Sequence, residues 1–378
     1  MKMLILALLM AAITILLAVV PQKLKTPYKL LLSVVVLLGC LKQQLIRLAG
    51  GPLFFAPDLP GWILLPSNWL YAVTVLFFLL LAASWILLAA VGGITWCWRK
   101  IAWGHFMRIF RKLPLILLIL SVVLTSWGMY CGMTAPEVKR VTFAHKQLPA
   151  AAENMRIAVL ADLHIDNITC GEHIQKIIDQ TNALQADVIV ILGDIVDGTV
   201  QKRRQDVLLL EKLQAPYGVF AIMGNHDCYS GYREWMEFFR QMNFTMLENR
   251  HYQLPNKVYL SGMPDPAARK MAGVEPDLEQ TLSGIPAEAF NILLAHRPGT
   301  AHEAAGRAVD LQLSGHTHGG MIRFFDRLIG RFNGGFISGF YRLNDLTLYV
   351  SNGTAIWNGF PIRLGRPSEI TLITLKRN

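Results

Sequence analysis

Residues 187–194 read DVIVILGD, an apolar and largely β-branched run that ends in glycine and aspartate. A run of this kind, without polar alternation, predicts a strand that is buried on both faces. Gly193 permits a tight turn, and Asp194 follows at the carboxyl end of the strand, where ligands collect in open α/β sheets. An aspartate after a strand is also a common turn former or helix cap. The stretch alone therefore leaves a structural and a functional role open.

The composition divides the chain into two halves. The 378 residues are 53% hydrophobic and 16% charged, which excludes an ordinary soluble protein. Residues 1–150 hold 14 Lys and Arg against 2 Asp and Glu, whereas residues 151–378 hold 22 against 24. The net charge of +10 therefore belongs to the apolar half, where it is typical of a membrane topology signal. We expect no nucleic-acid partner.

Residues 1–134 predict a membrane domain of about four helices. Three apolar runs are each long enough to cross a hydrocarbon core of ~30 Å as a helix. They are Met3–Val20, Asn68–Trp98 and Leu113–Met133. A fourth run, Leu30–Leu48, is interrupted by Lys42 and Arg47, and it predicts either a span with snorkelling ends or an interfacial helix.

Lysine and arginine in the short loops predict the orientation of these helices. The loop from Trp98 to Leu113 includes Arg99 and Lys100 among several basic residues, whereas residues 50–67 contain none. The basic loop is therefore expected in the cytoplasm, and everything after Met133 on the far side. This predicts an integral protein of a bacterial inner or plasma membrane with an extracytoplasmic C-terminal domain.

Residues 135–154 are polar, contain Pro136 and Pro149, and are predicted to be a linker. From Met155 onward, strand and helix signals alternate, which predicts a layered α/β domain over residues 155–378. Besides Asp187–Leu192, strands are expected at Arg156–Leu160, Gly218–Met223, Val258–Gly262, Asn291–Ala295, Leu311–Ser314, Leu346–Ser351 and Glu369–Leu375. Helices are expected at His173–Ala183, Gln201–Leu213 and Tyr232–Met242.

Five of the predicted strands end in aspartate, asparagine or histidine. The candidate metal ligands are Asp162, His164, Asp194, Asn225, His296, His316 and His318. A lone histidine is usually a core or surface residue, but Asp-x-His and Gly-His-x-His can point two side chains at one site. Imidazole nitrogens with a few carboxylate and amide oxygens suit Mn, Fe or Zn, and are too nitrogen-rich for Mg or Ca.

Seven candidate ligands exceed the needs of one ion that keeps open positions, so we expect two divalent ions, with manganese favoured. Two ions ~3.5–4 Å apart need a bridging carboxylate, and they clamp a displacement at phosphorus by a shared hydroxide. Asp194, on the central strand, is placed to bridge. The expected partners are a phosphate ester, with lipid-linked esters among the candidates, and membrane lipids.

The polar half resembles the calcineurin-like metallophosphoesterases over about residues 155–376. Their motifs occur here in order as Asp162-x-His164, Gly193-Asp194-x-x-Asp197, Gly224-Asn225-His226-Asp227, His296 and Gly315-His316-x-His318. The resemblance implies a two-sheet β-sandwich flanked by helices, here behind N-terminal transmembrane helices. It implies one ion on Asp162, His164 and His318, a second on Asn225, His296 and His316, and Asp194 between them.

The resemblance also assigns catalytic roles. It implies that His226 contacts the phosphate and that Asp227 orients His226. The predicted helix starts only at Tyr232, so Asn225 and His226 are expected on an extended loop, where neighbouring side chains point to different sides. On that basis His226 should miss the ions.

The chain is most similar to a membrane-anchored subgroup with several spans before this domain. Asn352-Gly353-Thr354 and Arg363 share in that similarity, whereas Cys228 and Met321 replace a usual aromatic and a usual glutamine. Arg363 is open to two interpretations, a bidentate phosphate ligand or a partner of an acidic neighbour. Cys170 and Cys228 are the two cysteines of the polar half, and a disulfide between them is left open.

Three functions follow from these features. The first is a membrane-anchored hydrolase of phosphomonoesters or phosphodiesters. A narrower alternative is a lipid-precursor pyrophosphatase that resembles the UDP-diacylglucosamine hydrolases, against which the outward orientation counts. A third is a catalytically silent, metal-stabilised receptor or assembly domain, against which the complete ligand set and His226 count.

Overall fold

A computed structural model describes residues 2–50, 57, 59–97 and 103–378 of the chain. The chain separates into two compact units. One comprises Met1–Tyr130 with Gly359–Ile362, and the other comprises Cys131–Asn358 with Arg363–Asn378. The first holds the apolar helices, and the second holds the α/β domain, as the sequence predicts.

The apolar helices account for nearly all of the first unit. They are α1 (Lys2–Thr14), its π-helical continuation (Ile15–Val19), α2 (Thr26–Cys40), α3 (Lys42–Gly50), α4 (Gly61–Cys97) and α5 (Trp103–Met133). Among the described residues, three segments are long and apolar enough to cross a membrane, namely Lys2–Val19, Gly61–Ala90 and Lys112–Met133. Leucines and isoleucines on their outer surfaces are exposed, which suits a hydrocarbon solvent.

The weakest predicted span is broken in the structure. Helices α2 and α3 meet at Leu41 with a bend of 68°, inside the predicted run Leu30–Leu48. The pair is either a broken span or a re-entrant loop. Arg99 and Lys100, on which the orientation partly depends, lie outside the described residues.

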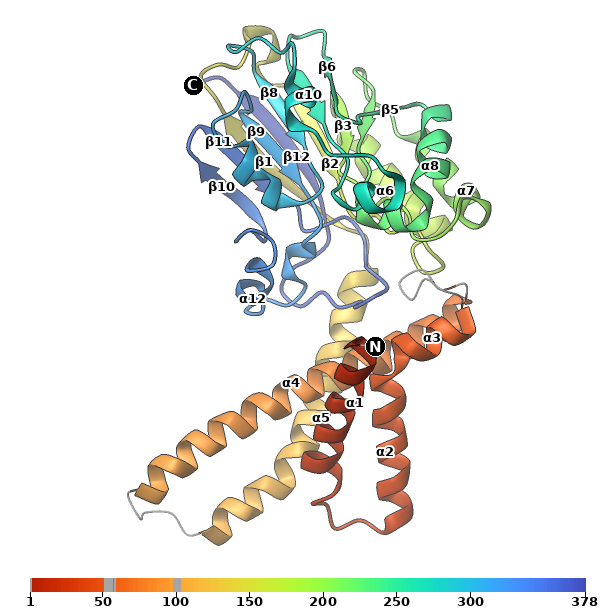
Figure 1. The fold of residues 1–378 in the computed structure, drawn as a ribbon, viewed down its shortest axis with the longest axis vertical. Helices are drawn as coiled ribbons and strands as arrows, with labels where there is room; N and C mark the ends of the chain where they lie inside the picture. Colours follow the sequence, from red (N-terminus) through yellow and green to blue (C-terminus); the bar gives the residue numbers. More distant parts are fainter. Residues whose placement is uncertain (1, 51–56, 58, 98–102) are drawn as a thin grey trace. The chain divides into compact units, whose positions relative to one another are not determined.

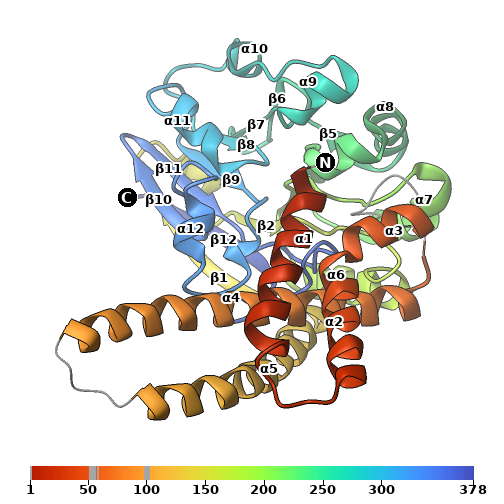
Figure 2. The same ribbon diagram turned by 60° about the horizontal axis from the view of Figure 1, so that its bottom comes forward.

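The α/β unit contains two six-stranded mixed sheets (Figures 1 and 2). The first has the order β1-β12-β2-β3-β4-β5, and the second β10-β11-β9-β8-β7-β6. The first sheet consists of β1 (Glu137–Ala144), β12 (Glu369–Lys376), β2 (Arg156–Leu160), β3 (Val188–Ile191), β4 (Val219–Ala221) and β5 (Phe244–Met246). The second consists of β10 (Gly339–Leu343), β11 (Leu346–Val350), β9 (Leu311–Ser314), β8 (Asn291–Leu294), β7 (Tyr259–Gly262) and β6 (Arg250–Gln253).

Parallel pairing brings the ends of the central strands together. Strands β2 to β5 are parallel to one another in the first sheet, as are β7, β8, β9 and β11 in the second. The carboxyl ends of parallel strands meet at one edge of a sheet, so the loops that follow them share one end of the domain.

Alternating side chains divide the interior into three cores. In β3, Val188 and Val190 pack between the sheets, whereas Ile189 and Ile191 pack on the outer face with α6 (Gly171–Ala183). The outer core also includes residues of α7 (Val200–Leu208) and α8 (Asn225–Gln241). A third core covers the outer face of the second sheet beside α10 (Leu278–Leu282) and α11 (Ala301–Ala304). The result is a helix–sheet–sheet–helix arrangement, which confirms the predicted two-sheet sandwich.

Several predicted boundaries differ from the structure, two of them in regions that bear on the site or its sheet. Residues 135–154, predicted as a linker, contain β1, which pairs in parallel with β12 along eight residues. The reason is an edge position: β1 is mostly exposed or half-buried, so its sequence is polar, and its partner lies some 230 residues further along the chain. Helix α8 starts at Asn225 instead of Tyr232, with a kink at Gly231.

The cysteines settle one further alternative. Cys170 and Cys228 are both free thiols, so the disulfide left open by the sequence does not form. Burial raises the pKa of the Cys228 thiol, with nearby carboxylates adding to the effect, so this side chain behaves as a small apolar core residue.

Candidate metal centre

All seven predicted ligands follow central strands at the shared end of the two sheets. The first sheet contributes four of them, namely Asp162 and His164 after β2, Asp194 after β3 and Asn225 after β4. The second sheet contributes His296 after β8, and His316 and His318 after β9. The two sheets, which are formed by different parts of the sequence, thus place the seven predicted ligands in one cluster.

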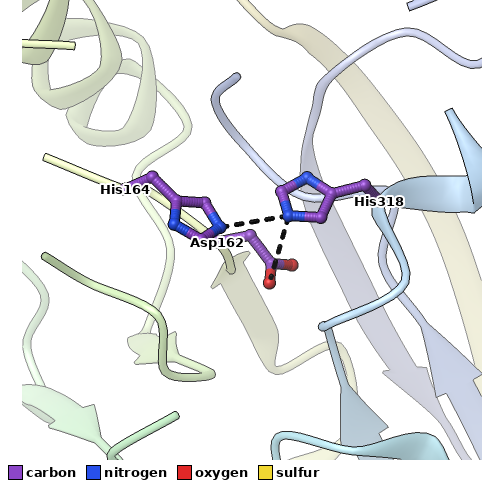
Figure 3. Close-up of side chains that lie close together, drawn as sticks. All are labelled: Asp162, His164 and His318. Carbon is purple, nitrogen blue, oxygen red and sulfur yellow. Dashed lines mark hydrogen bonds and ion pairs between the residues drawn. The ribbon is translucent and has the colours of Figure 1, made fainter. Parts of the chain in front are cut away.

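The first group of predicted ligands is Asp162, His164 and His318, all buried (Figure 3). The Nε2 atoms of His164 and His318 lie 3.1 Å apart. Nε2 of His318 is 3.9 Å from Oδ1 of Asp162. One ligand atom from each residue lies within 4.8 Å of the others, so a single cation would reach all three.

The second group contains Asp194, His296 and His316. Nε2 of His296 lies 3.2 Å from Oδ2 of Asp194 and 3.2 Å from Nδ1 of His316. Oδ2 of Asp194 is also 3.8 Å from Nε2 of His164, a member of the first group. Asp194 therefore lies between the two groups, where a bridging carboxylate is expected.

Asn225 completes the donor set. Its Oδ1 is buried and has no hydrogen-bond partner among the described residues. A buried amide oxygen without a partner costs free energy unless something else satisfies it. Histidine nitrogens that face one another, carboxylates and this amide oxygen together form the donor set that divalent transition metals prefer. The residues present thus fit two divalent ions.

The backbone is constrained where these side chains are presented. Five of the seven predicted ligands have a positive φ, between 42° and 72°. They are Asp162, His164, Asp194, His316 and His318. Non-glycine residues rarely adopt this conformation, and such strain concentrates at functional sites. Beside Asp194, a Cβ on Gly224 would clash with the carboxylate, so only glycine fits there.

Asp197 supports two histidines at once. Its Oδ2 lies 3.0 Å from Nδ1 of His164, and its Oδ1 lies 2.6 Å from Nδ1 of His226. A carboxylate on one ring nitrogen fixes the imidazole so that the other nitrogen faces the site. The sequence identified Asp197 as a motif residue but gave it no role.

The structure corrects the role expected of Asp227. The Asp227 carboxylate accepts backbone N–H groups of Ile195, Val196 and Gly224 at 2.8, 3.0 and 2.7 Å. It therefore ties the loop after β3 to the start of α8, and Asp197 is the residue that orients His226. Burial and the nearby Asp194 raise the pKa of Asp227 to about 7.

His226 lies in the first turn of α8, and not on the extended loop expected from the sequence. Its backbone N–H donates to Oδ1 of Asp194 at 2.7 Å. One ligand atom of His226 also lies within 4.8 Å of His164 and Asp194. The side chain is thus beside the predicted bridging carboxylate, within reach of a group bound there.

Charge in the site is unevenly distributed. Burial disfavours a proton on His296 and on His226, but nearby carboxylates outweigh it. Asp194 raises the pKa of His296 to about 10, and Asp197 with Asp194 raises the pKa of His226 to about 9. For His318, burial lowers the pKa well below its usual value, and the cation of Arg363 lowers it further.

Arg363 fits neither of the two interpretations left open by the sequence. Its buried guanidinium donates to the carbonyl oxygens of His318, Asn352 and Ala355 at 2.7, 2.6 and 2.7 Å. Nη2 also lies 3.0 Å from Nδ1 of His318. Arg363 therefore fixes the loop and the ring of one predicted ligand, and its donors are directed at the protein.

The chain is similar to known proteins over the residues that form this site. A family profile described as calcineurin-like phosphoesterase matches residues 155–320. An uncharacterized metallophosphoesterase of Campylobacter jejuni is 32% identical over 311 residues, which cover 81% of this chain and 80% of the relative. A transmembrane protein with metallophosphoesterase domain from Danio rerio is 32% identical over 280 residues, covering 71% of this chain and 63% of that protein.

Among solved structures, a 5'-nucleotidase precursor from Thermus thermophilus aligns with a TM-score of 0.39 and 13% identity. The alignment covers 58% of this chain and 55% of that one.

Proposed function

Because the chain belongs to the calcineurin-like phosphoesterase family, we propose that it is a membrane-anchored dinuclear-metal hydrolase of phosphomonoesters or phosphodiesters. The observation that carries the proposal is the meeting of two ligand groups at Asp194, with His226 beside them. Two bound divalent ions would supply the Lewis acidity that polarises a phosphoryl group and lowers the pKa of an attacking water.

The residues of the chain have distinct parts in this proposal. Asp162, His164 and His318 would hold one ion, Asn225, His296 and His316 would hold the other, and Asp194 would serve both. His226, fixed by Asp197 through Nδ1, presents Nε2 to the phosphate. With its raised pKa it is an imidazolium near neutral pH, able to stabilise developing charge or to protonate the leaving oxygen.

Manganese is the favoured metal, with iron and zinc as the alternatives. The nitrogen-rich donor set supports this choice over magnesium and calcium. The substrate class is a phosphate ester, and a lipid-linked ester is the candidate that membrane attachment supports.

The test is turnover by the full chain in detergent after loading with manganese. Phosphomonoesters, phosphodiesters, nucleotides and lipid headgroup esters would be offered in parallel, with Asp194→Asn as the inactive control. We expect hydrolysis of at least one class that a chelator abolishes. A protein that keeps two ions but turns over no class would instead be the silent scaffold.

We further propose that the α/β domain is extracytoplasmic. The basic residues between Trp98 and Leu113 support this orientation, although the structure places Arg108, Arg111 and Lys112 in the first turns of α5 and not in a loop. A cysteine at the exposed Gln147 should react with an impermeant reagent in intact cells. A cysteine at the exposed Lys112, the first residue of the last candidate span, should react only after lysis, and the unsubstituted chain corrects for its own cysteines. The reverse pattern would invert the orientation and favour a cytoplasmic lipid precursor as substrate.

A further inference from the structure

Residues 321–332, which we term the Phe–Arg segment, expose large apolar side chains directly after a predicted metal ligand. The segment follows His318-Gly319-Gly320 and includes the short helix α12 (Asp326–Gly330). Phe324 is 86% exposed, Phe332 83% and Leu328 53%. Single exposed apolar residues are common, but a group of this kind on one segment indicates a contact surface.

The same segment is basic. Arg323, Arg327 and Arg331 are all exposed and alternate with the apolar residues. The only acidic residue of the segment, Asp326, accepts a hydrogen bond from Nη2 of Arg366 at 2.7 Å and is thereby neutralised. The surface therefore offers aromatic rings among three exposed arginines.

The backbone of this segment is hydrogen-bonded to the rest of the domain. The backbone N–H of Arg323 donates to the carbonyl of Leu364 at 2.9 Å, and Leu364 donates back to Met321 at 2.9 Å. On the inner side, Gly330 packs closely against the buried Ile337. The base of the segment is thus fixed to the domain, while the phenylalanines point outward.

The segment lies at the corner of the domain where the chain arrives from the last apolar helix. The N–H of Glu137, the first residue of β1, donates to the carbonyl of Ser368 at 2.9 Å. Two residues before Ser368, Arg366 holds Asp326 of α12. In Figure 1, α12 lies beyond the strands of the second sheet at one end of the domain.

Covalent connection limits how far this corner can be from a bilayer. Helix α5 ends at Met133, and only three residues separate it from Glu137. Four residue steps span at most roughly 14 Å. Since Lys112–Met133 is a candidate span, the start of β1 stays close to the membrane surface in any arrangement of the two units.

We propose that the Phe–Arg segment docks on the headgroup region of an anionic membrane. Phe324 and Phe332 enter the interface, and the three arginines contact lipid phosphates. A second copy of the chain is disfavoured as the occupant, since a two-fold contact would set the same arginines against one another. The proposal goes beyond the proposed hydrolysis and does not depend on it.

The test is the depth of a nitroxide label on Phe324→Cys in the full chain. The protein is placed in nanodiscs of equal phosphatidylcholine and phosphatidylglycerol, and collisions with oxygen and with a water-soluble nickel chelate are compared. Tyr252→Cys is the matched control, because Tyr252 is 47% exposed and pairs with Leu260 near the start of β7, away from the ligand end. The labelled unsubstituted chain corrects for its own cysteines.

We expect the label at position 324 to favour oxygen and the label at position 252 to favour the nickel chelate. Equal access of the nickel chelate to both positions would overturn the proposal. Dipolar broadening of the spectrum would show that two labels are close together. If position 324 were shielded from the nickel chelate only in samples with such broadening, the occupant would be a second copy of the chain and the proposal would be overturned.

The role of charge is tested with the triple variant Arg323→Gln, Arg327→Gln and Arg331→Gln, labelled at position 324. The ratio of oxygen to nickel collisions should fall in this variant, and also in the parent chain when phosphatidylglycerol is omitted. An unchanged ratio in both experiments would contradict docking by anionic lipids.

Discussion

The two groups of predicted ligands that meet at Asp194 are supported in different ways. In the first, charged side chains hold both histidines, with Asp197 on Nδ1 of His164 and Arg363 on Nδ1 of His318. In the second, Nδ1 of His296 lies 2.7 Å from the backbone carbonyl oxygen of Leu192. The first group therefore depends on distant side chains that substitution can remove, whereas the second depends on the course of the backbone.

The largest effect is expected at Asp194, the residue that the two groups share. Asp194→Asn should abolish turnover and lower the metal content, because in the proposed site one carboxylate would serve two ions. Elemental analysis of the purified variant measures the content. Two ions still bound per chain would contradict the bridging role.

His226 should separate catalysis from metal binding. Removal of one such transition-state contact typically costs about 10²–10³-fold in turnover. His226→Ala should lose roughly that factor and keep both ions, most severely with alkyl esters, whose leaving groups are poor. Asn225→Ala is the matched control and should lose the ion of the second group. Loss of an ion from His226→Ala would identify His226 as a ligand.

Much of this site was predictable because its signals are local. Each ligand motif occupies a few residues after a strand, and the parallel order of the strands brings the motifs together. The same locality explains the limits. Asp197 contacts His226, which is 29 residues away in the sequence, and Arg363 contacts His318, which is 45 residues away. Neither contact can be predicted from the spacing of the motifs.

The fold was predictable to a similar extent. Strands buried on both faces, such as β2 and β3, have continuous apolar sequences and were found with boundaries close to the predicted ones. Strand β1 was missed because an exposed edge requires few apolar residues. The start of α8 was misplaced because its first turn carries functional polar residues, and Gly231 interrupts its helical pattern.

Substitution of Arg363, which contacts a histidine of the first group only, should have a smaller effect that differs between the two groups. Arg363→Lys keeps the charge but cannot satisfy three carbonyls and a ring nitrogen at once. Loss of a contact that orients a ligand typically weakens metal affinity about 10–100-fold. We expect the first-group ion to bind more weakly and the second to be unaffected, measured by metal titration. The exposed Arg342→Lys is the control, and equal weakening of both ions would contradict the distinction.

The smallest expected effect is a dependence of metal affinity on pH. The pKa of His296 is raised to about 10, so His296 carries a proton at neutral pH that an ion of the second group must displace. Affinity for that ion should therefore fall as pH falls, by up to about tenfold per pH unit. His318, with its lowered pKa, is a neutral imidazole near neutral pH, so no imidazolium proton has to be displaced there.

Calorimetry in buffers of different ionisation enthalpy measures this proton release. The wild-type chain should release a proton that Asn225→Ala, lacking the second ion, does not. Identical release from the two proteins would show that the proton comes from elsewhere.

The most direct test of a dinuclear phosphoesterase is to measure metal content and turnover on one preparation of the full chain. After loading with manganese, we predict two ions per chain and hydrolysis of a phosphate ester. Removal of the ions by a chelator should abolish hydrolysis, and their return should restore it. At most one ion per chain at saturating metal, or hydrolysis that survives removal of both, would contradict the account.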